Sequence, residues 1–218
     1  MIEEILPAAA VAVEAFTDAE GVVLFPEEER VVAKAVGKRR REFETGRDCA
    51  HRALAGLGLP AGPVPAGERG EPLWPAGVVG AITHCRGYRA AVVSRTADLV
   101  AIGIDAEPHE ALPEGLLDDI AGPAEVGMLG ELARATPAIH WDRLLFSAKE
   151  AVYKAWYPLA ERWLGFEDAV LEIDPRGGTF AARLLVPGPL LGGEEVRGFE
   201  GRWLVRDGLL LTAIAVRA

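Results

Sequence analysis

The most constraining feature of this sequence is the order in which its expected helices and strands follow one another. Pro26, followed by three glutamates, is typical of a helix start, and residues 47–57 carry an apolar stripe at helical spacing. Short runs with β-branched residues then predict strands at 78–83, 88–94 and 100–107. The second half repeats this order, so we expect a mixed α/β (α+β) protein.

The strongest helix pattern of the chain begins this second round. It covers residues 141–157, and we expect Pro158 to end or disturb it. In the first round, Gly37 is expected to weaken or end the helix that starts at Pro26. Asp207-Gly208 is typical of a hairpin turn and joins the last two strands. The strands predicted after the strong helix cover 169–173, 179–185, 201–206 and 209–216.

Two segments lack a clear pattern of their own. Residues 60–77 are rich in proline and glycine and are expected to form a loop. Residues 108–137 are acidic and contain prolines, so a helical or irregular excursion is expected there.

The composition restricts the class of protein. The chain has 218 residues, half of them apolar, which is enough for a well-buried core. No apolar run reaches the roughly 20 residues needed to span a bilayer, so a membrane protein is not expected. Glu3 and Glu4 stand where a signal peptide would carry lysines, which predicts a cytoplasmic location. Cys49 and Cys85 are expected to be free thiols.

The charge is distributed unevenly along the chain. The formal net charge is −10, which argues against general binding to nucleic acid. Residues 30–52 nevertheless hold eight bases and three acids, a local net charge of +5. Such a segment indicates a site for a polyanion of limited size or a docking patch for an acidic partner, and a solvated helix face is the alternative.

The strand predicted over 100–107 contains a candidate cation site. Side chains alternate between faces along a strand, so Gly103, Asp105 and Glu107 share one face while Ile102 and Ile104 point into the core. Two carboxylates on one strand face, beside a glycine that leaves room for a ligand, suit a hard cation. A solvated strand end is the plain alternative.

The strong helix offers a complement to these carboxylates. Glu150 and Lys154 recur at four-residue spacing on one face, with Lys149 beside them. A third carboxylate would complete a Mg²⁺ site, and a lysine ammonium could hold a phosphate oxygen. An ordinary surface pair of glutamate and lysine is the alternative. Thr83 and His84, at the end of a predicted strand, could bind an anion or be structural.

Taken together, these motifs resemble the 4′-phosphopantetheinyl transferases of the surfactin type, in the branch of enterobactin synthase component D and its actinobacterial relatives. The matching segments are Arg39-Arg40-Arg41-Glu42-Phe43, Gly46-Arg47-Asp48-Cys49-Ala50-His51-Arg52-Ala53-Leu54, Gly70-Glu71-Pro72-Leu73-Trp74-Pro75, Ile82-Thr83-His84-Cys85, Gly103-Ile104-Asp105-Ala106-Glu107-Pro108, Phe146-Ser147-Ala148-Lys149-Glu150-Ala151-Val152-Tyr153-Lys154-Ala155-Trp156 and Trp163-Leu164-Gly165-Phe166-Glu167-Asp168.

The resemblance implies a fold and an activity. Two similar α/β halves, residues 1–100 and 101–218, would be related by a pseudo-twofold, with coenzyme A in the cleft between them. The first half would contact the coenzyme's phosphates, and the second would carry the metal site and the catalytic helix. The enzyme would be a holo-[acyl-carrier-protein] synthase that transfers the 4′-phosphopantetheine arm of coenzyme A to a serine of an apo acyl or peptidyl carrier protein. Adenosine 3′,5′-bisphosphate would be released.

The resemblance also implies roles for individual residues. Mg²⁺ would be held by Asp105, Glu107 and Glu150, and Glu150 and Lys154 would be catalytic. The residues expected to bind coenzyme A are Arg47, Arg52, Arg69, Thr83, His84, Asp105, Lys149 and Lys154. Many members carry lysine where this chain has Glu71, so that contact is assigned to Arg69. A monomer is expected, with no nucleic acid or membrane as partner.

Two other readings use the same residues. A Mg²⁺-dependent nucleotide hydrolase or phosphotransferase could use the three carboxylates, and a non-catalytic coenzyme A sensor could use the basic segment without turnover. A mass shift of a carrier protein separates the transferase from both.

Overall fold

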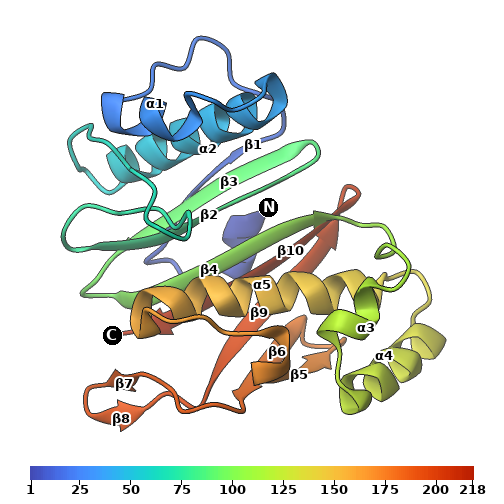
Figure 1. Ribbon diagram of the computed structural model, residues 1–218. Coiled ribbons are helices and arrows are strands. Elements are labelled where there is room, and N and C mark those ends of the chain that lie inside the picture. The colour runs from blue at the N-terminus through green and yellow to red at the C-terminus, as the bar shows by residue number, and fades with distance from the viewer.

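The computed structural model describes all residues from 1 to 218 and contains two antiparallel sheets (Figure 1). The first has the order β1-β3-β2, with β1 at Val11–Ala15, β3 at Tyr88–Arg95 and β2 at Val78–Cys85. The second has the order β4-β10-β9-β6-β5. Its strands are β4 (Leu99–Pro108), β10 (Leu209–Arg217), β9 (Gly198–Arg206), β6 (Thr179–Leu184) and β5 (Ala169–Asp174). A short hairpin, β7 (Leu190–Leu191) and β8 (Glu194–Glu195), stands apart.

Each sheet carries one long helix on a face (Figure 1). Helix α2 (Gly37–Gly56) packs on the first sheet and α5 (Trp141–Ala160) lies across β4 and β10. The shorter elements are η1 (Ile2–Ile5), α1 (Pro26–Val32), α3 (Leu116–Ile120), α4 (Pro123–Ala135) and η2 (Phe166–Asp168). The predicted mixed α+β class is therefore confirmed.

Helix α5 is held by an apolar stripe and by a close backbone approach. Leu144, Ala148, Val152 and Ala155 are fully buried or nearly so against the second sheet. A Cβ atom at Gly103 would lie only 1.9 Å from the carbonyl oxygen of Ala151. Gly103 therefore lets α5 approach β4, which corrects the expectation that this glycine leaves room for a ligand. The approach brings the polar face of α5 onto the carboxylates of β4.

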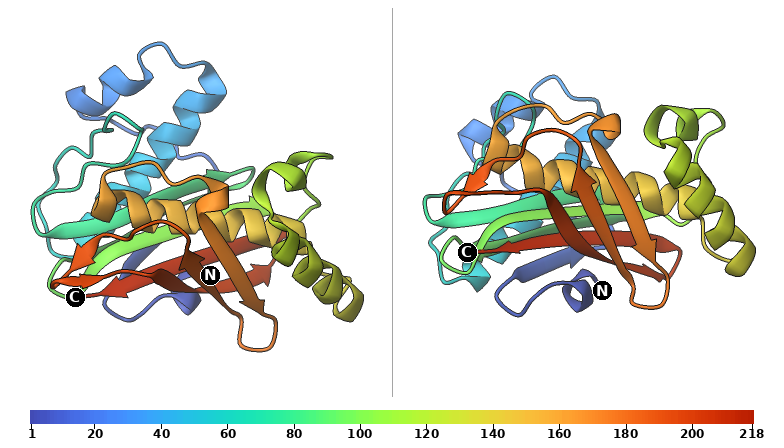
Figure 2. Two further views of the ribbon diagram at one scale, coloured as in Figure 1. Left: turned by 60° about the horizontal axis from the view of Figure 1, so that its bottom comes forward. Right: turned by 90° about the horizontal axis from the view of Figure 1, so that it is seen from below.

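The other face of β4 packs into a core between the two sheets. Ile102 and Ile104 are buried there with Leu211 of β10 and with Ile2 and Ile5 of η1. Figure 2 shows η1 on the side of the second sheet that faces away from α5. Strand β2 lies alongside β4, so the strand that ends the first sheet meets the strand that begins the second. The predicted boundary near residue 100 stays a prediction.

Most predicted strands agree with the structure, and the predictions at three helix boundaries were wrong. The helix expected over 47–57 starts much earlier, because α2 runs from Gly37 to Gly56. Gly37 does not end the first helix, because α1 stops at Val32 and Gly37 opens α2, where the amide of Arg40 already bonds to the carbonyl of Val36. Pro158 does not end α5, because it lies in the last turn and the helix runs on to Ala160. Asp207 and Gly208 both have positive φ, as a tight hairpin turn requires.

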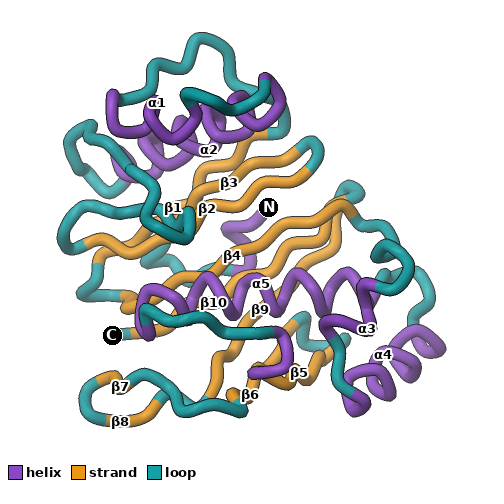
Figure 3. The backbone as a smooth tube through the Cα atoms, in the orientation of Figure 1, coloured by secondary structure: helices purple, strands orange, loops and turns teal.

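The segment 57–77 between α2 and β2 is a long loop, as expected (Figure 3). The buried carboxylate of Glu28 fixes it, because its Oε1 accepts a hydrogen bond of 2.8 Å from the amide of Val64. The same carboxylate receives the amide of Phe25 and lies 2.8 Å from Nε2 of His51. Helix α1, helix α2 and the loop thus meet at one side chain. No helix of the structure combines the length and apolar character needed to cross a bilayer.

Candidate active site

The facing surfaces of β4 and α5 bring together the carboxylates that the sequence pattern singled out. Asp105 and Glu107 lie on the face of β4 that α5 covers, and Glu150 and Lys154 lie on the helix. The ammonium of Lys154 donates to Oδ1 of Asp105 at 2.7 Å. Asp105 thereby links the strand to the helix within a largely buried site.

Asp105 has one engaged and one free oxygen. Besides Lys154, its Oδ1 accepts a bond of 3.2 Å from the hydroxyl of Thr83 in β2. Its Oδ2 is buried and has no hydrogen-bond partner. Thr83 also accepts a bond of 3.1 Å from the amide of Ala106, so its hydroxyl bridges β2 and β4. A buried unpartnered carboxylate oxygen is costly, which indicates a ligand atom for a cation.

Glu107 is held by an arginine from the first turn of α5. Its Oε2 accepts a bond of 2.9 Å from Arg143. Desolvation raises the pKa of Glu107, the negative charge of Asp105 raises it further, and Arg143 opposes both. The Glu107 carboxylate is therefore repelled by the charge of Asp105 and attracted by the charge of Arg143.

Glu150 makes neither a hydrogen bond nor an ion pair, although it is partly buried between these residues. Desolvation raises the pKa of its carboxyl, Lys154 lowers it, and Asp105 raises it. No three potential ligands are already gathered at metal-binding distance. Two of the three carboxylates are occupied by cationic side chains, and Glu150 is the one left free.

In the first half of the chain, Arg47 of α2 is a buried cation without an acidic partner. The residue is 5% exposed, its guanidinium lies 4.4 Å from the ring centre of Phe43, and its Nε has no hydrogen-bond partner. Burial lowers the pKa of Arg47 to about 10, the charge of Glu28 partly opposes this, and Arg39 adds to it. A buried guanidinium with a free N–H is poised to bind an anion.

Arg39, in the first turn of α2, lies beside His84 at the end of β2. Its Nη1 is 2.7 Å from Nε2 of His84. Desolvation by neighbouring atoms lowers the pKa of His84 although the residue is exposed. The charge of Arg39 lowers it further, that of Glu42 opposes this, and Lys154 adds a smaller lowering effect. The contact with Arg39 places a permanent positive charge beside the His84 imidazole.

The two other predicted arginines stand farther out. Arg52 pairs with Asp48 on the surface of α2, and its side chain is 59% exposed. Arg69 projects from the loop 57–77, and its guanidinium lies 6.0 Å from the ring centre of Trp163, which follows α5. Arg69 thus connects the two halves of the chain, whereas Arg52 is an ordinary surface pair in this structure.

Lys149 requires a correction. Its ammonium donates to Glu125 of α4 at 3.0 Å and to the carbonyl oxygens of Phe166 and Ala169 at 2.7 and 3.0 Å. All three N–H groups are used, and the side chain is 3% exposed. Lys149 therefore fastens α4, η2 and the start of β5 to α5, and no N–H group remains for the predicted contact with coenzyme A.

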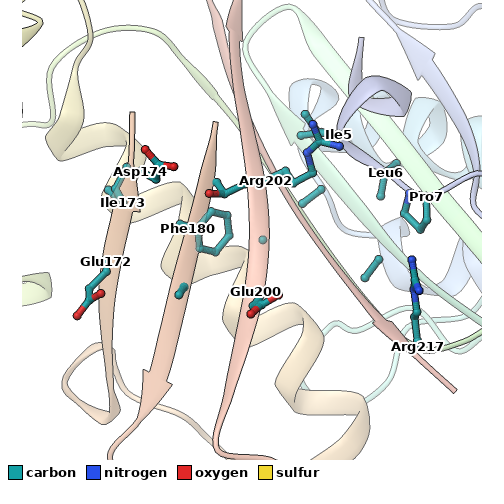
Figure 4. A pocket seen from close by; sticks show the side chains of 15 residues that line it. Ile5, Leu6, Pro7, Glu172, Ile173, Asp174, Phe180, Glu200, Arg202 and Arg217 are labelled. Carbon is teal, nitrogen blue, oxygen red and sulfur yellow. The ribbon is translucent and has the colours of Figure 1, made fainter. Parts of the chain in front are cut away.

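Two hollows differ in their relation to these residues. The larger, about 840 Å³, is lined by residues of η1 and of the second sheet, among them Ile5, Phe180 and Arg202, and by none of the predicted site residues (Figure 4). The smaller, about 160 Å³, lies between α5 and the segment after it, and Glu150 and Trp163 are among its mostly apolar lining. Of the three candidate carboxylates, Glu150 lines the smaller hollow, and Asp105 and Glu107 line neither.

Two residues of this site were missed by the sequence reasoning. Arg39 entered only as part of the basic segment and of a matching motif, without a role of its own, and Arg143 was not singled out. The motif Arg39-Arg40-Arg41 could have suggested a phosphate contact, but the register of α2 was needed to choose among the three. For Arg143, the only available signal was its seven-residue spacing from Glu150, which places both on one face of a helix.

Comparison with known families and proteins adds an independent finding. Residues 27–94 match the 4′-phosphopantetheinyl transferase N-terminal domain, and residues 101–197 match the 4′-phosphopantetheinyl transferase superfamily. The chain is 56% identical to the 4′-phosphopantetheinyl transferase Svp of Streptomyces mobaraensis, covering 100% of this chain and 90% of that protein. It is 50% identical to PptT of Mycobacterium tuberculosis, covering 93% and 90%. Enterobactin synthase component D of Escherichia coli is 40% identical over 54% of this chain and 55% of its own length.

Proposed function

The chain belongs to the 4′-phosphopantetheinyl transferase family, and we propose that it carries out the transfer with Mg²⁺ held by Asp105, Glu107 and Glu150. As an enzyme of this family it uses coenzyme A as substrate and modifies carrier proteins. The observation that carries the metal assignment is the buried, unpartnered Oδ2 of Asp105. The readings as a nucleotide hydrolase or a coenzyme A sensor find no support among the relatives.

The donor set suits a hard divalent cation. All three candidate ligands are carboxylates, the oxygens that Mg²⁺ prefers, and few protein ligands suffice because phosphates and water complete its coordination. Glu107 and Asp105 each share an oxygen with a cationic side chain. We therefore expect weak binding of the metal alone and stronger binding with coenzyme A, whose diphosphate gives Lys154 an alternative partner. When bound, Mg²⁺ would supply neutralisation of the charge that develops on the diphosphate.

The cationic side chains have separate tasks in this proposal. Lys154 moves from Asp105 to the diphosphate and stabilises the leaving adenosine 3′,5′-bisphosphate. Arg47, Arg39 and His84 hold the phosphate on the ribose, supported by the free Nε of Arg47 and by the contact between Arg39 and His84. Arg69, whose guanidinium lies 6.0 Å from the ring centre of Trp163, is proposed to make a longer-range phosphate contact.

Glu150 is the proposed base for the hydroxyl of the carrier serine. It is the only one of the three carboxylates without an ion pair, so no cationic side chain competes with the proton that it would accept. A carboxylate that also binds metal is a weaker base than a free one. The serine proton therefore passes to Glu150 either directly or by way of a water molecule. The serine hydroxyl loses its proton as its oxygen bonds to the phosphorus of the phosphopantetheine. The bond from that phosphorus to the leaving adenosine 3′,5′-bisphosphate breaks.

The small cavity beside Glu150 offers a place for the pantetheine arm. Its lining is mostly apolar and includes Tyr153, Trp163 and Phe166. An elongated, weakly polar arm suits such a lining better than the charged cleft does. The arm would then lie next to the base while the diphosphate lies at the carboxylates. We also propose that the enzyme is a cytoplasmic monomer.

The metal assignment is tested by the magnesium dependence of transfer. Asp105→Ala removes the buried oxygen and the partner of Lys154, so we expect a lower rate and a higher Mg²⁺ concentration for half-maximal rate. Mass spectrometry of an apo-carrier protein, incubated with coenzyme A over a Mg²⁺ series, measures both. A Mg²⁺ dependence identical to that of the wild type would exclude Asp105 from the metal site.

The phosphate assignment is tested by matching a deletion in the protein with a deletion in the ligand. A charge-assisted contact contributes about 1.5–3 kcal/mol, so Arg47→Ala is expected to weaken coenzyme A binding by about 10- to 150-fold. The same variant should barely change the affinity for 3′-dephospho-coenzyme A. That ligand lacks the 3′-phosphate, so the interaction that Arg47→Ala removes is already absent.

Calorimetry with the two ligands measures this difference, and Arg52→Ala is the matched control on the same helix. Equal weakening for both coenzymes would contradict the phosphate assignment. If the basic segment only docked an acidic carrier, coenzyme affinity would be normal and the carrier KM would rise with salt.

A further inference from the structure

Arg143 makes three directed hydrogen bonds at the start of α5. Its Nη1 donates to Glu107 at 2.9 Å, its Nε to the carbonyl oxygen of Glu110 at 3.1 Å, and its Nη2 to that of Ala111 at 2.7 Å. The neighbouring Asp142 accepts the amide of Leu112 at 2.8 Å. The first turn of α5 thus fixes the segment that follows β4. The guanidinium of Arg143 also connects this segment to Glu107, a candidate metal ligand.

The guanidinium is well ordered by its surroundings. The side chains of Arg143 and Glu107 are 12% and 19% exposed, so the pair is shielded from water. The planar guanidinium of Arg143 is bound to three oxygens and is thereby held in one orientation. A lysine ammonium on its flexible chain would not be held in this way. Glu107 therefore has little rotational freedom as long as Arg143 is present.

The helix places Arg143 in line with the catalytic face. Arg143 and Glu150 are two turns apart, about 10 Å along the axis, and Lys154 follows one turn later. Along this face the charges alternate: Arg143 binds Glu107, Lys154 binds Asp105, and Glu150 stands between them without a partner. Each strand carboxylate is held by one cation of the helix.

The two cations differ in what ligand binding can do to them. Lys154 has a single side-chain partner, which a diphosphate can replace. Arg143 is fixed by two backbone carbonyls as well as by Glu107, so it stays in place when the coenzyme arrives. It suits the role of a permanent support for a ligand rather than that of a substrate contact.

We propose that Arg143 is a positioning residue of the metal site, which orients Glu107 toward the divalent cation through the bond to Oε2 and leaves Oε1 for the metal. This inference rests on the proposed function of Asp105, Glu107 and Glu150. Outer partners that hold a ligand carboxylate typically contribute 10- to 100-fold to metal affinity. Arg143 acts through Glu107 and touches neither the substrate nor the metal.

Positioning and simple electrostatics predict opposite signs. Removing a positive charge beside a cation site should strengthen cation binding by Coulomb's law. Removing the support of Glu107 should weaken it. We expect Arg143→Ala to weaken Mn²⁺ binding by about 10- to 100-fold, measured by electron paramagnetic resonance of free Mn²⁺ in the presence of coenzyme A. Arg143→Lys keeps the charge but not the fork, and should also bind more weakly than the wild type.

A double variant shows whether Arg143 acts through Glu107. Glu107→Ala should itself weaken Mn²⁺ binding, and adding Arg143→Ala should then cause no further loss. Arg86→Ala is the matched control, because Arg86 pairs with Glu110 of the same segment but is 75% exposed, and it should leave Mn²⁺ affinity unchanged. Thermal unfolding of each variant confirms that folded protein is being measured.

The outcomes separate this inference from the function it rests on. Unchanged or tighter Mn²⁺ binding in Arg143→Ala, with weaker binding in Glu107→Ala, would overturn the positioning role alone. Full additivity in the double variant would overturn it too, since Arg143 would then act independently of Glu107. Unchanged Mn²⁺ binding in Glu107→Ala would overturn the metal assignment of Glu107 and the inference with it.

Discussion

Replacing Glu150 by glutamine is expected to slow phosphopantetheine transfer by about 10²- to 10⁴-fold or more, while the affinity for coenzyme A changes only a few-fold. Glutamine has the shape of glutamate but loses the negative charge and the proton acceptor. The carboxylate of Glu150 has no hydrogen bond or ion pair to lose, so the fold should be unaffected. Desolvation raises the pKa of the Glu150 carboxyl, so the folded protein disfavours its charged form. Replacing it by a neutral amide can therefore stabilise the protein slightly.

The rate is measured by the mass of an apo-carrier protein over time, and the affinity by calorimetry. Glu131→Gln, at an exposed position of α4, is the matched control and should behave like the wild type. Turnover at the wild-type rate in Glu150→Gln would remove Glu150 from the mechanism. A large loss of coenzyme affinity together with rate would instead assign it to binding.

Replacing Lys149 by methionine is expected to lower the free energy of unfolding by about 3–5 kcal/mol, because it leaves a buried carboxylate without its cation. Glu125 would keep only the amides of Gly122 and Leu171, each at 2.9 Å. Adding Glu125→Leu to Lys149→Met should recover only part of the loss, because it removes the unpaired charge but leaves the amides of Gly122 and Leu171 without their acceptor.

Urea unfolding measures these differences in the free energy of unfolding. The control is Arg86, which forms an exposed ion pair with Glu110. Arg86→Ala should cost less than about 1 kcal/mol. At temperatures where Lys149→Met remains folded, its affinity for coenzyme A should change only a few-fold, because Lys149 borders the cavity proposed for the pantetheine arm but its ammonium is fully bonded within the protein. A selective loss of coenzyme affinity without loss of stability would restore Lys149 to the binding site and contradict its structural assignment.

The periodicity of the sequence predicted the fold where local pattern and tertiary environment agree. Strands β2, β3 and β4 and helix α5 lie within a few residues of their predicted positions. The errors arose where position within an element decides the effect of a residue. Pro158 is tolerated because only two helical residues follow it, and Gly37 begins a helix because the chain turns before it.

The site was predictable in its chemistry and less so in its contacts. A short motif could identify the carboxylates and Lys154, since residue type and spacing carry that information. It could not show that Lys149 turns toward Glu125, that Gly103 serves helix packing, or that Arg143 reaches Glu107. Each of these depends on a partner at least 24 residues away in the sequence. Such pairings are set by the arrangement of the elements.

The position of the metal tests the carboxylate assignment directly. Crystals of the wild-type protein with coenzyme A and Mn²⁺ would show the ion by its anomalous scattering. We expect an anomalous peak about 2 Å from oxygens of Asp105 and Glu150, with the coenzyme diphosphate on its open side. A peak bound to the diphosphate but out of reach of both carboxylates would contradict it.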